Sequence, residues 1–217
     1  MKFDPQKHQR TSTRMQGYDY SSAGAYFITL VTHQRDMLFG EIENGVMKLN
    51  RHGQIVHEEW FRSAEIRKEI RLYEEEFVVM PNHIHGIVWI VDVGADGIRP
   101  IVNDDSVGAT DINVGVDDKI VETDDNVGAD DNVVVGADGR PPLRMPSRKP
   151  RSLGSFVAGF KSSVTKRIRD ELNETGIWQR NYHDRIIRND RELDAIRKYI
   201  QVNPLNWEKD EENPITR

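Results

Sequence analysis

The stretch that most constrains the fold is HIHGIVWIV, residues 83–91. Apart from its two histidines it is a nearly continuous run of β-branched and aromatic residues, which is typical of a strand covered on both faces. The preceding EEFVVM of 75–80 predicts another strand, and Pro81-Asn82 predicts a turn between the two. The chain is therefore expected to build a sheet with 83–91 near its centre.

The N-terminal part predicts a strand, a hairpin and a helix. Residues 26–32, YFITLVT, have the β-branched and aromatic composition of a strand. In FGEIENGVMKL, the pair Asn44-Gly45 suits a type I′ turn between two short strands. Asn50 is a predicted N-cap for an amphipathic helix over about 51–70.

The C-terminal part predicts two more helices around a strand. From Ser152, apolar residues recur every three or four positions for about 20 residues, which indicates an amphipathic helix. A strand-and-loop segment follows at 177–189. A capping-box pattern at Asn189 begins a helix that runs to about Val202, just before Pro204. The order of elements predicts an α+β fold with helices packed on a mainly antiparallel sheet.

Composition limits the class of protein. The 217 residues include no cysteine, which excludes disulfides and thiolate chemistry. No apolar run could span a membrane and the N-terminus lacks a signal-peptide pattern, so a cytoplasmic protein is expected. The net charge is -6, but 92–139 alone holds 13 acidic and 2 basic residues, and the rest of the chain carries +5.

That acidic segment consists of VGAD-like units at irregular spacing, without any aromatic residue. A short β-solenoid or a calcium-binding repeat is one interpretation. The irregular period and the high acidity favour a disordered insertion instead. We therefore expect one domain with a core at about 18–91 and 150–207, interrupted by the insertion at 92–139 and a basic, proline-rich arm at 140–151.

The histidine pair is the first candidate site. Residues two apart on a strand face the same side, so His83 and His85 should project together while Ile84 points into the opposite layer. Two imidazoles at this spacing can bind one divalent ion, whereas burying them unpaired would be unfavourable. The alternative is a pair of hydrogen-bonded core or surface histidines, and two ligands alone do not complete a metal site.

A second candidate lies on the last predicted helix. Tyr199 and Asn203 are four residues apart and share one face of it. The apolar stripe that would dock this helix runs beside Tyr199, so its phenol could emerge over the sheet. The alternative is a boundary tyrosine that only packs its ring, followed by an asparagine that ends the helix.

A basic tract provides a candidate nucleic-acid surface. From Arg140 to Arg169 there are nine basic residues and no acidic one, and neutralisation of phosphates by such residues dominates affinity for DNA. A solvated helix face is the alternative. Two aromatic residues further on could stack on bases or belong to the core. The candidate DNA-binding residues are Arg140, Arg144, Arg148, Lys149, Arg151, Lys161, Lys166, Arg167, Trp178 and Tyr182.

Several stretches together resemble the single-tyrosine HUH transposases of bacterial insertion sequences, especially the REP-associated tyrosine transposases. They are GYDYSSAGAYFITLVTHQR, LNRHGQIV, FVVMPNHIHGIV, LGSFVAGFKSSVTKRI, WQRNYHDRIIRND and YIQVNP. They cover nearly everything except the tails and the acidic segment, which departs from the family's compact pattern. The resemblance implies a ferredoxin-like HUH fold in which the tyrosine helix packs beside the histidine strand.

The resemblance also implies an enzyme activity and its residues. His83 and His85 match the metal-binding histidines, Tyr199 matches the nucleophile, and Asn203 falls where relatives place a polar third ligand. The implied metal is Mg²⁺ or Mn²⁺. The implied reaction is cleavage and transfer of single-stranded DNA through a 5′-phosphotyrosine intermediate, at DNA that contains a hairpin. The partner would be DNA and no membrane, and the protein would be a monomer or a homodimer.

Three alternatives remain open from the sequence. Tyr182, beside His183, is a rival nucleophile with a neighbouring base. A domesticated or inactive relative would bind DNA hairpins without cutting them. A hydrolase of small substrates would hold zinc at His83 and His85, but it would need a further ligand that the strand does not offer. The sequence does not place the remaining candidates for that role, which are His33, His52 and His57.

Overall fold

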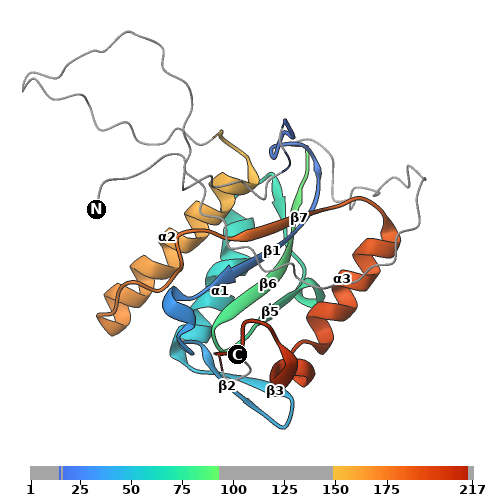
Figure 1. Ribbon diagram of the computed structural model, residues 1–217. Helices are drawn as coiled ribbons and strands as arrows, with labels where there is room; N and C mark the ends of the chain where they lie inside the picture. Colours follow the sequence, from blue (N-terminus) through green and yellow to red (C-terminus); the bar gives the residue numbers. More distant parts are fainter. Residues whose placement is uncertain (1–14, 16, 93–148, 215–217) are drawn as a thin grey trace, which may run out of the picture.

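The computed structural model describes residues 15, 17–92 and 149–214 (Figure 1). The predicted insertion at 92–139 and the arm at 140–151 lie outside these ranges except for their ends. The helices are α1 (Arg51–Ile66), α2 (Leu153–Leu172) and α3 (Asp190–Val202), with short 3₁₀ turns η1 (His33–Arg35), η2 (Glu74–Glu76) and η3 (Pro204–Lys209). The strands are β1 (Gly24–Val31), β2 (Gly40–Glu43), β3 (Val46–Leu49), β4 (Ile70–Arg71), β5 (Phe77–Val79), β6 (His83–Ile90) and β7 (His183–Ile187).

The main sheet is antiparallel and has β6 in its interior. One edge of β6 pairs with β1, and β7 pairs with the far side of β1. The other edge of β6 pairs first with β5 and then with β4. All eight residues of β6 are buried, as the run of apolar residues predicts. The predicted α+β fold with helices packed on an antiparallel sheet is confirmed.

The helices are divided between the two faces of this sheet, and Figure 1 shows α1 and α2 on the side away from α3. Alternate residues of β1 serve the two layers. Tyr26, Ile28 and Leu30 pack into the larger core under α1 and α2. Ala25 and Phe27 pack into a smaller core under α3, where Ile87 and Trp89 of β6 also lie. A side chain on β6 therefore faces one of two distinct environments.

Local signals in the sequence account for the ends of most elements. The side chains of Asn50, Ser152 and Asn189 each accept a hydrogen bond from a backbone N–H three residues later, which caps α1, α2 and α3. Asn44 and Gly45 have φ values of 52° and 75°, as the predicted turn requires. These caps and this turn agree with the sequence-based expectations.

The strand β1 begins at Gly24, two residues earlier than predicted, and two other boundaries also differ. The helix α1 ends at Ile66 instead of residue 70, because Ile70 pairs with Ile90 at the edge of the sheet and is 1% exposed. The strand expected from 75 starts at Phe77, because Glu76 belongs to a 3₁₀ turn that directs its carboxylate inward. In both cases a tertiary contact determines the boundary.

None of the helices within the described ranges combines the length and the apolar character needed to cross a membrane.

Candidate functional site

His83 and His85 lie at the start of β6, where this strand pairs with β1, and their side chains are on the α3 face of the sheet. Ile84, between them, points into the core under α1 and α2. The two imidazoles are 0% and 3% exposed, and their Nε2 atoms are 3.0 Å apart. The period of two along the strand thus brings both rings to one point, as expected from the sequence.

Asn82 determines which nitrogen of His83 carries the proton. The Asn82 Nδ2 group donates to the backbone oxygens of Arg35 and Glu212, at 3.2 and 2.7 Å. Its Oδ1 is thereby directed at Nδ1 of His83, 2.9 Å away, which must donate. His83 therefore presents an unprotonated Nε2 towards His85, the arrangement found in metal-binding histidines whose other ring nitrogen donates a hydrogen bond.

Thr29 plays the corresponding part for His85. Its Oγ1 lies 2.8 Å from Nδ1 of His85 and can accept a hydrogen bond from Nδ1–H, which leaves Nε2 unprotonated for a ligand. Burial lowers the pKa of His83 to about 3, and the positive charge of Arg35 acts in the same direction. Burial, followed by the neighbouring His83, also lowers the pKa of His85. Both rings are therefore neutral at pH 7, which is the form that binds metals.

Tyr199 reaches the histidine pair from α3. Its phenolic oxygen is 3.2 Å from Nε2 of His85, and its ring packs edge-on against Phe27. Burial raises the pKa of Tyr199, and the nearby Asp210 raises it further, while a hydrogen bond from the Asn203 side chain opposes these effects. The phenol is consequently protonated at neutral pH and lies beside the two imidazoles.

A buried charge pair fixes the part of α3 that carries this tyrosine. Glu76 is 0% exposed, and its Oε1 accepts hydrogen bonds from Nε and Nη2 of Arg197 at 2.9 and 2.7 Å. Its Oε2 accepts a hydrogen bond from the indole of Trp89 at 2.6 Å. Leu193, Ile196 and Ile200 of α3 are buried over the same layer. The helix is therefore held two residues before Tyr199 by both charge and packing.

The chain after α3 returns over the histidines and brings in two further polar groups. Asn203 is 2% exposed, and its Nδ2 donates to Oδ2 of Asp210 at 3.2 Å. The Asn203 Oδ1 atom is buried and has no hydrogen-bond partner in the described residues. One ligand atom each from His83, His85 and Asp210 lies within 4.8 Å of the others. These three residues could hold one metal ion.

The geometry and chemistry of these groups fit a divalent cation. Two ligands at about 2.1 Å in adjacent octahedral positions are separated by about 3.0 Å, which is the spacing of the two Nε2 atoms. The unpartnered amide oxygen of Asn203 is a further hard donor. An orphaned buried oxygen is unfavourable unless a donor or a cation approaches it.

A pocket of about 140 Å³ opens beside this group. It adjoins the phenol of Tyr199 and the ring of His85, so a ligand in it would contact both. The lining residues are Thr29, His85, His183, Tyr199, Asn203, Asn206, Lys209, Asp210, Glu211 and Glu212. The sequence analysis considered His183 only as a partner of Tyr182. Its register opposite Thr29 on β7 places it on the face of Tyr199.

The structure places the predicted DNA-binding residues of α2 away from the histidines, because α2 covers the other face of the sheet. Lys161 donates to the backbone oxygens of Gln179 and Asn181 at 2.7 and 2.8 Å. Lys166 pairs with Asp170. Arg167 binds Glu58, Glu59 and Glu171, which raises its pKa above the ordinary value, with Glu171 the largest cause.

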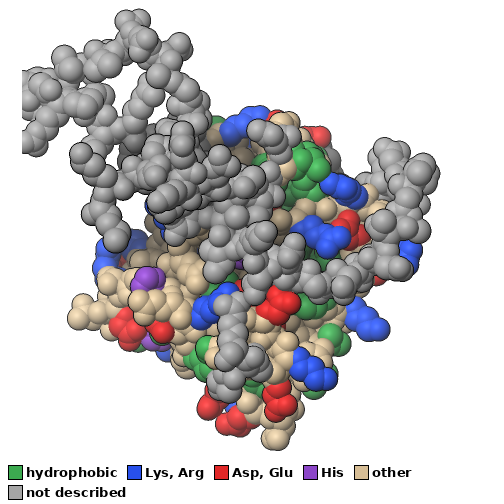
Figure 2. All heavy atoms as spheres, in the orientation of Figure 1, with side chains coloured by type: hydrophobic (Ala, Val, Ile, Leu, Met, Phe, Trp, Pro, Cys, Tyr) green, Lys and Arg blue, Asp and Glu red, His purple; other side chains and the backbone are tan. Residues whose placement is uncertain are grey.

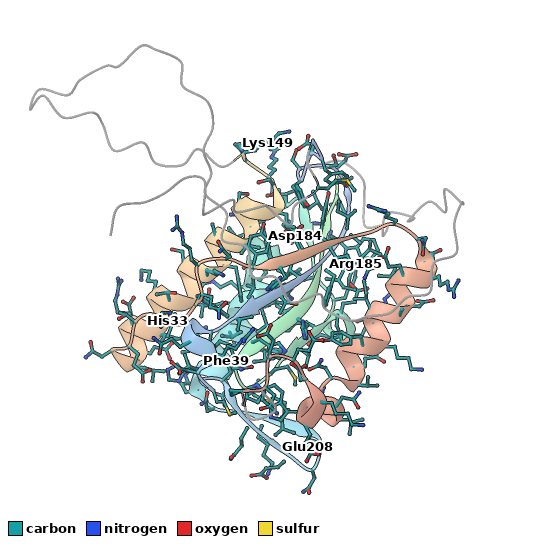
Figure 3. The ribbon with its side chains drawn as sticks, in the orientation of Figure 1. His33, Phe39, Lys149, Asp184, Arg185 and Glu208 are labelled. Atoms are coloured by element: carbon teal, nitrogen blue, oxygen red, sulfur yellow. The ribbon has the colours of Figure 1, made fainter. Side chains whose placement is uncertain are left out.

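The remaining predicted contacts are also distant from the site or undescribed. Lys149 pairs with Asp19, and Figure 3 places it at the opposite end of the molecule from Glu208 of η3. Arg151 is exposed at the start of α2. Trp178 and Tyr182 are partly buried against the core under α1 and α2. Arg140, Arg144 and Arg148 lie outside the described residues.

Other exposed basic side chains lie on the elements that border the histidines. Figure 2 shows lysine and arginine side chains along the side of the molecule that α3 forms. Arg185 also pairs with Glu192 at 2.6 Å and so links β7 to α3 (Figure 3). The exposed basic residues of β7, α3, η3 and their connection are Arg185, Arg188, Arg191, Lys198 and Lys209. Only the register of β7 and the docking face of α3 could have indicated them from the sequence.

Three histidines that the sequence left unplaced are engaged elsewhere or exposed. His52 lies 3.1 Å from Glu174 and His57 lies 3.5 Å from Glu74, both on α1. His33 is exposed at η1. The third ligand candidate in the structure is Asp210, which the sequence analysis missed because it follows η3 and belongs to no periodic pattern.

The described residues thus define an α+β protein with a candidate metal site and a half-buried tyrosine on one face of its sheet. The chain belongs to the same family as an uncharacterised protein of Haemophilus influenzae (strain Rd), to which it is 32% identical over 211 residues. The alignment covers 97% of this chain and 96% of that protein. A search against protein-family models finds no match.

A solved structure of a REP-associated tyrosine transposase bound to a REP hairpin is also similar. The TM-score is 0.49 and the identity 16%, over 91% of this chain and 74% of that one. Values this low are insufficient to infer a function from that structure.

Proposed function

We propose that this protein is a metal-dependent tyrosine transposase that cuts and rejoins single-stranded DNA at hairpin-containing sites. The observation that carries the proposal is the position of the Tyr199 phenol, 3.2 Å from Nε2 of His85 within a buried pair of neutral imidazoles. A nucleophile beside a cation site is an arrangement that can perform phosphodiester transfer. The motifs shared with single-tyrosine HUH transposases point to the same chemistry.

The proposed cation is Mg²⁺ or Mn²⁺, held by His83, His85 and Asn203. When bound, a divalent ion supplies positive charge to the non-bridging oxygens of the scissile phosphate. Asn82 and Thr29 contact the Nδ1 atoms of the two rings, which would leave both Nε2 atoms available to hold the ion. The oxygen of Asn203 has no other partner in the described part of the chain, which supports its role as a ligand.

Tyr199 is the proposed nucleophile. Its oxygen forms a bond to phosphorus while the bond from phosphorus to the 3′-oxygen breaks, and the departing 3′-oxygen takes up a proton. The product is a 5′-phosphotyrosine that keeps the energy of the phosphodiester, so a second 3′-hydroxyl can reverse the step without ATP. The phenol must lose its proton, and His183 lines the same pocket with a nitrogen that can accept it.

Single-stranded DNA would approach the α3 face of the sheet. The elements that form this face, β7, α3 and η3, carry exposed basic side chains, and one of them, Lys209, lines the pocket of Tyr199. Basic side chains on α2 are engaged with acidic residues or backbone oxygens, and they lie on the other face. We therefore assign the DNA near the scissile phosphate to the α3 face of the sheet. Residues of the α2 side could contact a hairpin only further away.

The test is incubation of the protein with a hairpin-bearing single strand and Mn²⁺, followed by a denaturing gel. A covalent protein–DNA adduct is expected from the wild type and from Tyr182→Phe, and none from Tyr199→Phe or in EDTA. An adduct that survives Tyr199→Phe but disappears with Tyr182→Phe would transfer the role to Tyr182. Hairpin binding without any cleavage would indicate an inactive relative that only binds DNA.

A metal-dependent phosphodiesterase without a covalent intermediate is a second candidate. The grouping of Asp210 with the two histidines favours it, because two histidines and a carboxylate also form hydrolytic zinc sites. In that case the Tyr199→Phe variant would still cleave the DNA. The oxygen of a water molecule would be incorporated into the cleaved product. The same gel therefore distinguishes the two candidates.

A further inference from the structure

The segment after α3, residues 203–213, forms a strap over the histidine pair. We propose that this C-terminal strap is part of the metal site, with Asp210 as a ligand, so that cation binding and seating of the strap are coupled. The inference rests on the proposed metal dependence of the protein and adds a ligand that the sequence motifs do not contain.

The carboxylate of Asp210 is held in place before any cation arrives. Its Oδ1 accepts a hydrogen bond from the backbone N–H of Glu212 at 2.7 Å, and its Oδ2 accepts one from Nδ2 of Asn203 at 3.2 Å. A carboxylate can accept hydrogen bonds and bind a cation at the same time. Ligating carboxylates in metal sites have this kind of hydrogen-bonded support.

Asn203 gives an independent indication of a cation at this place. Its side chain is 2% exposed and lines the pocket beside Tyr199, yet Oδ1 has no hydrogen-bond partner among the described residues. The amide nitrogen therefore donates to Asp210, whereas the amide oxygen remains available as an acceptor or ligand. A cation between the imidazoles and the strap would satisfy that oxygen together with the carboxylate.

The strap also determines the orientation of His83. Glu212 is 7% exposed, and its carboxylate accepts a hydrogen bond from Nε of Arg35 at 2.7 Å. Its backbone oxygen accepts a hydrogen bond from Nδ2 of Asn82 at 2.7 Å. Because that bond turns Oδ1 of Asn82 towards Nδ1 of His83, displacement of the strap would release the ring from the orientation that offers Nε2.

These contacts make the strap and the cation mutually dependent. A cation that uses Asp210 binds only the seated strap, so by linkage it must stabilise the seated strap by the same factor. Glu211 and Glu212 of the strap also line the pocket of Tyr199. Loading the cation would therefore order one wall of the pocket in which the nucleophile operates.

Titration with Mn²⁺ alone, followed by calorimetry and electron paramagnetic resonance, tests the ligand without any DNA. We expect Asp210→Asn, which keeps the size of the side chain, to weaken Mn²⁺ binding at least about tenfold. Glu208→Gln is the matched control, because it removes the same charge from an exposed residue outside the pocket, and it should bind like the wild type. Equal affinity of Asp210→Asn and the wild type would overturn the assignment.

Hydrogen exchange tests the coupling. Mn²⁺ should slow exchange in peptides that cover 203–213, leave those of α2 unchanged, and have little effect in Asp210→Asn. Glu212→Ala, which loses the bond to Arg35, should lower Mn²⁺ affinity and speed exchange of the strap. Unchanged strap exchange with saturating Mn²⁺ would refute the coupling, although adduct formation could still support the transposase. A wild type that binds no Mn²⁺ would refute both proposals.

Discussion

The phenolic oxygen of Tyr199 lies 3.2 Å from Nε2 of His85, although the two residues are 114 positions apart in the chain. The contact joins the last helix to the central strand on the face of the sheet opposite α1 and α2. Two neutral imidazoles, a protonated phenol and a partly buried carboxylate are thereby collected around one pocket.

Replacing Tyr199 with Phe should abolish the covalent adduct and change the free energy of unfolding by only about 1 kcal/mol. The variant loses the hydrogen bonds of the hydroxyl with His85 and Asn203, whereas the ring would remain packed against Phe27. Adduct formation on a gel and urea denaturation measure the two quantities. A stability loss of several kcal/mol would mean that the phenol has a structural role and would leave the gel result without mechanistic weight.

Thr29→Val should weaken Mn²⁺ binding about tenfold to a hundredfold, because it removes the group that holds Nδ1 of His85. Thr29→Ser keeps the hydroxyl and should bind nearly as the wild type does. Calorimetric titration of the purified variants measures the affinities. If Thr29→Ser and Thr29→Val lower the Mn²⁺ affinity equally, the methyl group of Thr29 contributes to binding and its hydroxyl does not.

The metal-free protein should lose stability as the pH falls from about 6.5 towards 3. Because burial lowers the pKa of His83 to about 3, the unfolded chain binds more protons than the native state within this window. The stability that this residue contributes is complete above pH 6.5. At pH 5 the loss from His83 is about 2 kcal/mol, and His85 adds to it in the same direction.

Urea denaturation in EDTA at pH 7 and pH 5 measures that loss. His83→Gln, whose side chain does not titrate, should show a smaller difference between the two pH values. An equal difference in this variant would show that other groups cause the acid sensitivity.

Arg197→Ala should destabilise the protein by about 3–5 kcal/mol, because it leaves the fully buried carboxylate of Glu76 without its charge partner. Arg191→Ala, an exposed residue of the same helix, should change stability by no more than about 0.5 kcal/mol. Urea unfolding of both variants provides the comparison. Similar small effects would mean that the hydrogen bond from Trp89 suffices for Glu76.

Lys209→Ala should weaken binding of single-stranded DNA and reduce the slope of log K against log salt by about 0.7, the value expected for one lost phosphate contact. Lys68→Ala, an exposed lysine just after α1, should change neither the affinity nor the slope. Fluorescence anisotropy over a series of salt concentrations measures both. If Lys166→Ala weakened DNA binding more than Lys209→Ala, the DNA would bind on the α2 side instead.

The elements of the fold were predictable where the sequence carries a local signal. Caps at Asn50 and Asn189, the turn at Asn44-Gly45 and the period of two in β6 are local, and each is found where expected. The end of α1 was not, because Ile70 leaves the helix to pair with Ile90, a partner 20 residues away. Local propensity does not report such pairing.

The residues of the site also divide into those that local sequence signals predict and those that only the tertiary fold brings together. The sequence pointed to His83, His85, Tyr199 and Asn203 because strand and helix periods and the shared motifs select them. Asp210 follows an irregular turn, so only the path of the folded chain brings it to the histidines. The sequence suggested that the basic face of α2 is open to DNA. It could not show that acidic residues of α1, 108 and 109 positions before Arg167, pair with this residue.

Gly24 of β1 pairs with Ile90, whereas Val31 at the other end of β1 pairs with His83. The exit of β6 is therefore roughly 23 Å along the strand from the first histidine. The chain leaves for residues 93–148 at that remote exit and re-enters at Lys149, ahead of α2. A change in the length of this segment would therefore act at the end of the sheet remote from the histidines, and it would not need to shift their rings.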